Sequence, residues 1–147
     1  MKRCSALLAV CFILLNLSAA HADLASYLWE LNASARGNAA AYQKEIQQRF
    51  AVSAAKYGAI RQAVDAPGEV VVVLWLRERA NAPADTVLQT RRALPGGEWE
   101  AVALELGLSP ASEDFEALHY GELGWSPVGA ARYGSLVEYA DFHARLE

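Results

Sequence analysis

The chain has 147 residues, with 13 basic and 17 acidic side chains and a formal net charge of −4. This length is sufficient for one domain with its own hydrophobic core. Its two cysteines, Cys4 and Cys11, both lie in the first 22 residues. If those residues are removed, the remaining chain contains no cysteine, which excludes a disulfide framework, a thiolate metal ligand and a cysteine nucleophile.

The first 22 residues have the pattern of a cleavable signal peptide. Lys2 and Arg3 precede a nearly continuous apolar run over residues 6–17, and small residues then end in Ala20-His21-Ala22. The apolar run is shorter than the roughly 20 residues that cross a bilayer. It also continues past Cys11, which disfavours a lipid anchor there. We expect cleavage after Ala22, a periplasmic or secreted location, and no membrane anchor after cleavage.

Residues 23–125 are expected to form one all-α domain, a small bundle of about six short helices. Apolar residues at helical spacing predict two helices separated by Gly37-Asn38, with Leu24, Tyr27, Leu28 and Leu31 in the first and Tyr42, Ile46 and Phe50 in the second. Ser53 is predicted to cap a third helix, on which Tyr57, Ile60 and Val64 form the apolar stripe. Asp65 is the expected cap of the helix that follows.

The segment Val70–Leu76 is apolar at every position, and its four valines favour a strand by propensity. Periodicity does not distinguish a strand from a buried helix in such a run. Pro67 before it is typical of a helix start, and Arg77-Glu78-Arg79 after it extends the segment to helical length. No second strand-like run is available to pair with it. The sequence therefore predicts a buried central helix.

The second half of the domain is predicted to hold three further helices. The first follows Pro83 and carries Val87 and Leu88, and the next is marked by Trp99, Val102, Ala103 and Leu106. Gly107 is expected to end that helix in a left-handed conformation. Ser112 is the predicted cap of a short helix, which Gly121 ends. Residues 126–147 are expected to be a C-terminal extension with one amphipathic helix, marked by Leu136, Tyr139, His143 and Leu146.

This half of the domain also contains a sequence motif that is similar to the motif of a known protein family. The segment from Gly97 to Leu118 follows the pattern Gly-Trp-Gly-x-Ile-Ala-x-x-Leu-Gly-Ile-Lys-Pro-Gly-Ser-x-Glu-Phe-His-Ala-Leu, and Phe50-Ala51-Val52 matches a Phe-Gly-Val turn. The chain thereby resembles an uncharacterised family of small secreted proteobacterial proteins over about half of its mature length. The resemblance implies an all-helical fold and export, but no reaction. Ser109 replaces the family's lysine and Glu116 its histidine, so no role is transferred to those positions.

The acidic residues are concentrated in the second half of the chain. Loss of Lys2 and Arg3 with the leader would leave 11 basic and 17 acidic side chains, a net charge of −6. No basic residue occurs between Arg92 and Arg132, a stretch with seven acidic ones: Glu98, Glu100, Glu105, Glu113, Asp114, Glu116 and Glu122. These carboxylates form either a solvated helix face or a binding surface for a basic envelope protein or peptide. They would repel phosphates, so we expect no nucleic-acid partner, although Trp99–Leu118 resembles a helix-turn-helix.

Three arrangements could in principle carry chemistry. Glu116 and His119 share a helix face and could join Glu122 and His143 in a zinc site. A solvated histidine is the simpler interpretation, so we expect no metal and no cofactor. Ser112, His119 and Asp114 contain the residue types of a catalytic triad but lack a nucleophile motif. Glu98 and Glu105 are a carboxylate pair of the kind that cleaves glycosidic bonds.

Trp125 is the tryptophan that is hardest to assign to the core, because it lies in a Gly-Trp-Ser-Pro segment. It either anchors a partner, as exposed tryptophans do at interfaces, or covers the edge of the core. Together with Glu113, Asp114 and Glu116 it forms the predicted interaction surface. We expect a non-catalytic periplasmic interaction module, with a small cell-envelope hydrolase that uses glutamate carboxylates as the alternative.

Overall fold

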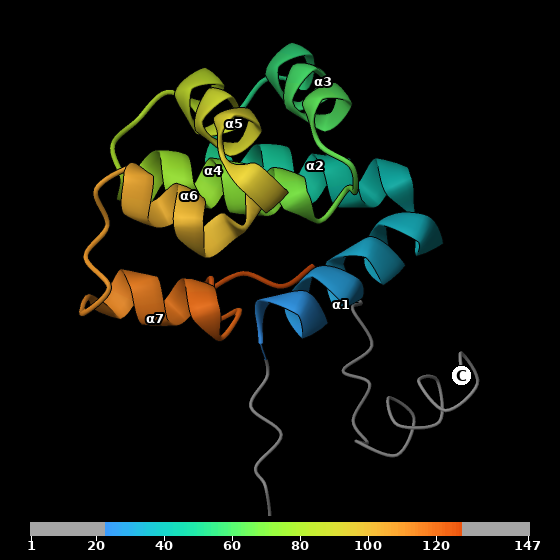
Figure 1. The fold of residues 1–147 in the computed structure, drawn as a ribbon. Helices are drawn as coiled ribbons and strands as arrows, with labels where there is room; N and C mark the ends of the chain where they lie inside the picture. The colour runs from blue at the N-terminus through green and yellow to red at the C-terminus, as the bar shows by residue number, and fades with distance from the viewer. Residues whose placement is uncertain (1–22, 128–147) are drawn as a thin grey trace, which may run out of the picture.

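A computed structural model describes residues 23–127, and within this range the chain is all-helical (Figure 1). The prediction of a small all-α domain is confirmed, with seven α-helices and one 3-10 turn. The predicted leader over residues 1–22 and the predicted helix from Leu136 to Leu146 lie outside the described residues. The elements are α1 Leu24–Gly37, α2 Ala39–Phe50, α3 Ala54–Ala63, α4 Glu69–Arg79, α5 Ala84–Ala93, η1 Pro95–Gly97, α6 Trp99–Glu105 and α7 Glu113–His119.

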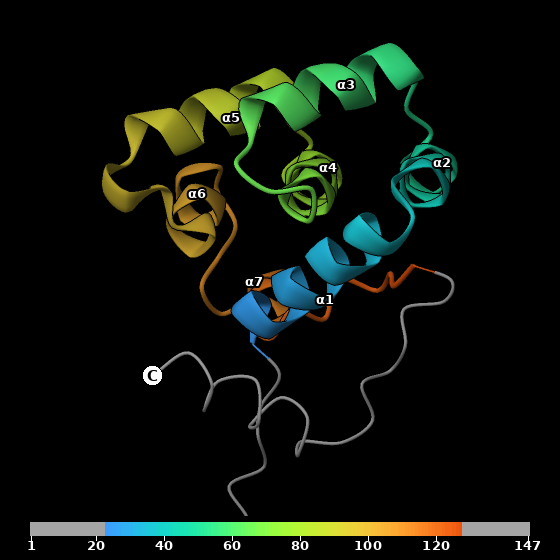
Figure 2. The ribbon, with the colours of Figure 1, turned by 90° about the vertical axis from the view of Figure 1, so that its right-hand side faces the viewer.

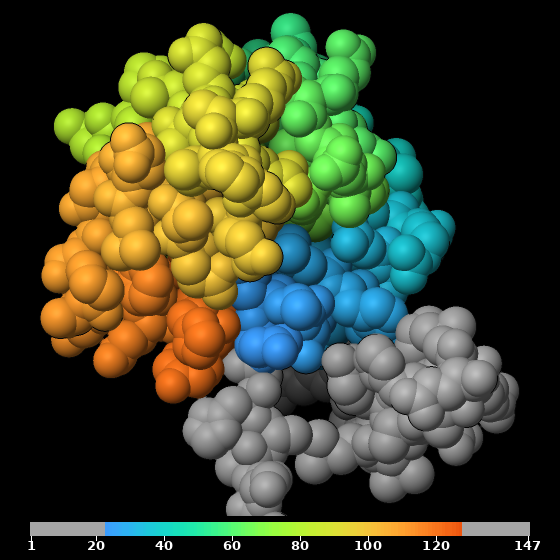
Figure 3. All heavy atoms as spheres, viewed as in Figure 1, coloured from blue at the N-terminus to red at the C-terminus, as the bar shows by residue number. Residues whose placement is uncertain are grey.

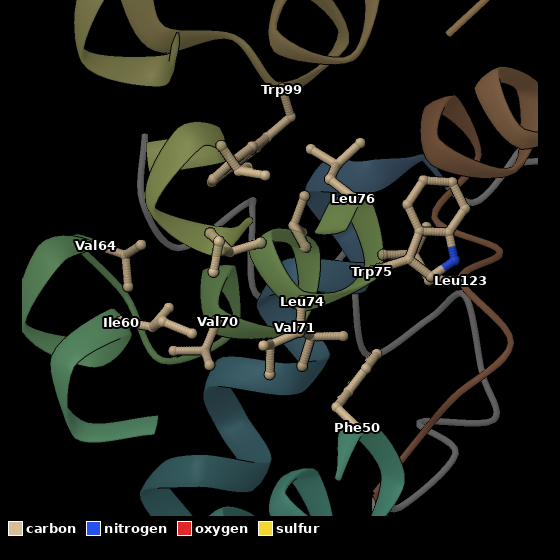
Figure 4. Packing of buried hydrophobic residues seen from close by; sticks show 14 of the residues in the cluster. Phe50, Ile60, Val64, Val70, Val71, Leu74, Trp75, Leu76, Trp99 and Leu123 are labelled. Carbon is tan, nitrogen blue, oxygen red and sulfur yellow. The ribbon is translucent and has the colours of Figure 1, made fainter. Parts of the chain in front are cut away.

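Helix α4 is the centre of the domain, and the other helices surround it (Figure 2). Every residue from Val70 to Leu76 is at most 1% exposed. The side chains of Val70, Val71 and Leu76 leave the helix in different directions and meet different neighbours (Figure 4). A helix that is apolar on all sides is stable in water only when it is enclosed in this way. The predicted buried central helix is therefore confirmed, and Trp75 on it is a core residue, 1% exposed.

The turn before α4 is built differently from the prediction. Asp65 does not cap the helix, because its side chain is 93% exposed and the position before α4 is Gly68. Instead, Oε2 of Glu69 accepts hydrogen bonds from the backbone N–H groups of Asp65 and Ala66, at 2.8 and 3.1 Å. Glu69 is thus the first residue of α4 and holds the turn from within the helix. It is buried, and its Oε1 pairs with the Arg91 guanidinium.

Four helices end in a left-handed residue that lets the chain turn back on itself. These residues are Ala51, Asn81, Gly107 and Gly121, with φ angles of 49°, 49°, 92° and 67°. At Gly107 the backbone bonds from Gly107 N to Leu104 O and from Leu108 N to Ala103 O, both 3.0 Å, complete a Schellman motif. The predicted cap is confirmed, and Leu108 is buried as that motif requires.

Helices α6 and α7 form a hairpin that closes one end of the bundle. Trp99, Val102 and Ala103 are buried on α6, while Leu104 points outward with 44% exposure. The end of α7 packs against the start of α1, and the two meet at the surface in the space-filling view (Figure 3). No helix within residues 23–127 has the length and apolar character to cross a membrane.

Candidate functional site

The first turn of α7 holds the three predicted acidic site residues. Ser112 caps the helix, since its Oγ accepts the backbone N–H of Phe115 at 3.2 Å, so the predicted cap is confirmed. Glu113, Asp114 and Glu116 follow in the first turn, where the helix dipole stabilises negative charge. The structure therefore brings these three carboxylates together on one short helix.

Only one of the three is held by a cation within the described part of the chain. Asp114 lies 3.3 Å from Nη1 of Arg79, which extends from the end of α4. Because Arg79 belongs to α4, this ion pair connects α7 to the central helix. The same guanidinium also lies 5.5 Å from the ring centre of Trp75 on α4. Glu113 and Glu116 are exposed and form no ion pair within residues 23–127.

The wider acidic surface runs from Glu98, directly before α6, through α6 and α7 to Trp125, and we call it the acidic end. It contains all seven carboxylates that lie between Arg92 and residue 127. Glu100 on α6 lies 3.6 Å from Nδ1 of His119 on α7. Five carboxylates of the acidic end are exposed and make no ion pair with another described residue: Glu98, Glu105, Glu113, Glu116 and Glu122. A surface with this excess of unpaired negative charge attracts cations.

Trp125 follows the C-terminal end of α7, whereas the three acidic residues lie at its N-terminal end. It is half-buried, packs against the core, and its ring meets that of Tyr42 edge-on at 6.0 Å. Its backbone carbonyl accepts a hydrogen bond of 2.6 Å from the Tyr27 hydroxyl. Burial raises the pKa of Tyr27, which keeps that hydroxyl protonated as the donor. Trp125 therefore covers the edge of the core, and part of it also remains accessible.

That accessible part of Trp125 lines a groove of about 480 Å³ between α1 and the chain after α7. Tyr27 and Glu30 contribute from α1, and Tyr120, Glu122 and Trp125 from the other side. The groove was not predicted from the sequence, because Tyr27 fitted the core stripe of α1 and Glu30 had no motif. The one local sign was Gly121, which lets the chain after α7 approach α1 closely.

The residue sets considered for catalysis are not assembled by the described structure. Oγ of Ser112 donates to the Ser109 carbonyl at 2.7 Å while it caps α7, so both of its roles are structural. Glu98 and Glu105 flank α6 at opposite ends, are both exposed, and do not line the groove.

The residues proposed for a zinc site are likewise not gathered within the described range. His119 approaches Glu100 and lies edge-on to the ring of Tyr120, 4.9 Å away. Residues 23–127 contain no group of three or more His, Asp and Glu side chains that could hold a metal ion. His143, the remaining candidate ligand, lies outside the described residues.

Comparisons with protein-family models, with curated proteins and with solved structures found no match for this chain. The functional argument therefore depends on the chain's own residues and geometry.

Proposed function

We propose that this protein is an exported, non-catalytic interaction module of the cell envelope, and that its acidic end binds a basic segment of another protein or peptide. The observation that carries the proposal is the set of five exposed carboxylates of the acidic end that form no ion pair within residues 23–127. Lysine and arginine side chains of a partner would pair with them. Such surfaces increase the rate of encounter and select partners by charge.

The exposure of these carboxylates favours binding over hydrolysis. A carboxyl group acts as a general acid near neutral pH when burial or a close carboxylate makes it retain its proton. Glu98 and Glu105 are exposed, and so are Glu30 and Glu122, the two carboxylates that line the groove. The carboxylates considered for hydrolysis therefore lack this feature, and the buried carboxylate of Glu69 is paired with the Arg91 guanidinium.

Export is proposed from the charge, apolar run and Ala-x-Ala pattern of residues 1–22. Mass spectrometry of the protein from the periplasmic or culture fraction tests this. A mature chain that begins at Asp23 supports export, whereas an intact N-terminus in the cytoplasmic fraction contradicts it.

The binding proposal is tested with a lysine- and arginine-rich peptide and fluorescence anisotropy at low and moderate salt. The double variant Glu113→Gln, Glu116→Gln removes two carboxylates from the acidic end. An exposed ion pair contributes about 0.2–1 kcal/mol, so we expect affinity to fall roughly two- to thirtyfold. Moderate salt should weaken the binding of the unmodified protein, because exposed pairs are screened.

The matched control removes the same charge elsewhere. Asp65→Asn, Asp85→Asn changes two carboxylates whose side chains are 93% and 70% exposed, away from the acidic end. It should leave peptide affinity nearly unchanged. An equal loss in the two double variants would mean that only net charge matters, and absence of binding at low salt would refute the proposal.

A further inference from the structure

The groove between α1 and the chain after α7 combines aromatic and acidic lining. Its described walls include the aromatic rings of Tyr27, Tyr120 and Trp125 and the carboxylates of Glu30 and Glu122. None of the described lining residues is basic, and neither carboxylate forms an ion pair within residues 23–127. Among the residues that the structure describes, the charge of the groove is therefore uncompensated, and a complementary ligand carries a positive charge.

The aromatic residues specify the kind of cation. Tyr120 is 37% exposed, and Trp125 is accessible on the groove side. Aromatic faces attract cations, and a guanidinium group can stack on a ring while its N–H groups donate to a carboxylate in the same plane. A lysine ammonium is a strongly hydrated point charge and cannot stack in this way.

The same chain already holds one arginine in such surroundings. The guanidinium of Arg91 lies 4.3 Å from the ring centre of Trp99 and pairs with the buried carboxylate of Glu69. Its Nε also donates to the carbonyl of Gly97 at 3.3 Å. An indole ring and a carboxylate thus bind a guanidinium inside this domain, and the groove presents the same two groups at the surface.

The walls of the groove are fixed before any ligand arrives. The hydrogen bond from Tyr27 to the Trp125 carbonyl holds the outer wall to α1. Gly121 lies so close to α1 that a Cβ atom there would be 2.6 Å from the Cβ of Tyr27. A site that is already formed loses little conformational entropy on binding.

We infer that this groove receives an arginine side chain of the partner, stacked on Trp125 and paired with Glu30 and Glu122. The inference rests on the proposed function, since it identifies the residue of the basic partner that anchors the complex. The carboxylates on the first turn of α7 would then meet further basic residues of the same partner.

The test follows the tryptophan indole N–H resonances of the purified protein by NMR during titration with N-acetyl-arginine amide. We expect the Trp125 signal to shift, while those of Trp75 and Trp99 stay in place because both rings are buried. The citrulline analogue has the same shape without the charge and should give no shift. The lysine analogue should bind more weakly than the arginine probe. No shift of Trp125, or an equal shift with citrulline, would overturn the inference.

Two double variants separate the groove from the helix. Glu30→Gln, Glu122→Gln should weaken the arginine probe about tenfold, because charge-assisted hydrogen bonds are lost. Glu113→Gln, Glu116→Gln should leave the probe unaffected and weaken only the basic peptide. If the peptide binds and the groove variant has no effect on either ligand, the groove assignment is wrong and the proposed function stands. If the probe binds the groove but no basic peptide binds, the proposed function fails and the groove remains an arginine site.

Discussion

Replacement of Gly121 by alanine tests the contact between the end of α7 and the start of α1. The residue has a φ angle of +67°, and a Cβ atom there would lie 2.6 Å from the Cβ of Tyr27 and 2.9 Å from the carbonyl oxygen of Asp23. Neither atom is the free end of a flexible side chain, so neither can move aside on its own. An alanine at this position would have to push the end of α7 away from α1.

Two effects set the size of the loss. The left-handed conformation costs alanine about 1–2 kcal/mol, of which about 0.4–1 kcal/mol is recovered because alanine restricts the unfolded chain. Overpacking against α1 adds about 1–3 kcal/mol. We therefore expect Gly121→Ala to lower the free energy of unfolding by about 2–4 kcal/mol. Urea unfolding followed by tryptophan fluorescence measures this.

Gly107 provides a matched control that isolates the cost of the left-handed backbone conformation from the cost of overpacking. It ends α6 in the same way, with a φ angle of +92°, but a Cβ atom there would have no neighbour within 4 Å. Gly107→Ala should therefore cost only about 0.5–1 kcal/mol. If both alanine variants lost the same stability, the close approach of α7 to α1 would be refuted. A smaller loss at Gly121 than at Gly107 would contradict it even more directly.

Three further predictions concern other parts of the fold. Ala51→Gly should raise the free energy of unfolding by about 0.5–1 kcal/mol in thermal melts, since Ala51 has a φ angle of 49°. Glu69→Gln should lower it by about 2–3 kcal/mol in urea, because the buried Arg91 contact loses its charge, and an unchanged midpoint would contradict this role. Burial raises the pKa of both Tyr27 and Tyr42 above the ordinary 10.0. The contribution of these two tyrosines to the free energy of unfolding should therefore be complete below pH 10. Above pH 10 it should fall by about 1.4 kcal/mol per pH unit for each tyrosine. Unfolding at pH 9 to 11 measures this, and Tyr27→Phe should reduce the slope.

Local patterns predicted the elements of this fold well. Ser53, Gly107 and Ser112 act within three or four residues of themselves, so their sequence neighbours were enough to identify them as caps. The buried helix Val70–Leu76 was harder, because an apolar run lacks a period. It was recognised from its polar flanks and from the lack of a pairing strand.

Contacts between distant residues were not predicted. The groove joins Glu30 to Glu122 and Tyr27 to Trp125, and no local pattern reports such a pairing. Glu69 was missed for a related reason. It stands at the edge of an apolar run, and the arginine that makes its burial possible is 22 residues away. Asp65 had the better local signal for a cap, but that signal did not include the tertiary contact of Glu69.

The complete enclosure of α4 also matters before the protein has folded. Under the proposed export, the chain would cross the inner membrane while α4 is only a stretch of unfolded hydrophobic sequence. A translocating channel releases such stretches sideways into the lipid when they are long enough to span it, which takes about 20 apolar residues. The apolar run of α4 extends from Val70 to Leu76, with Glu69 before it and Arg77 after it. The most hydrophobic part of the domain is therefore short enough to pass through to the other side and fold there.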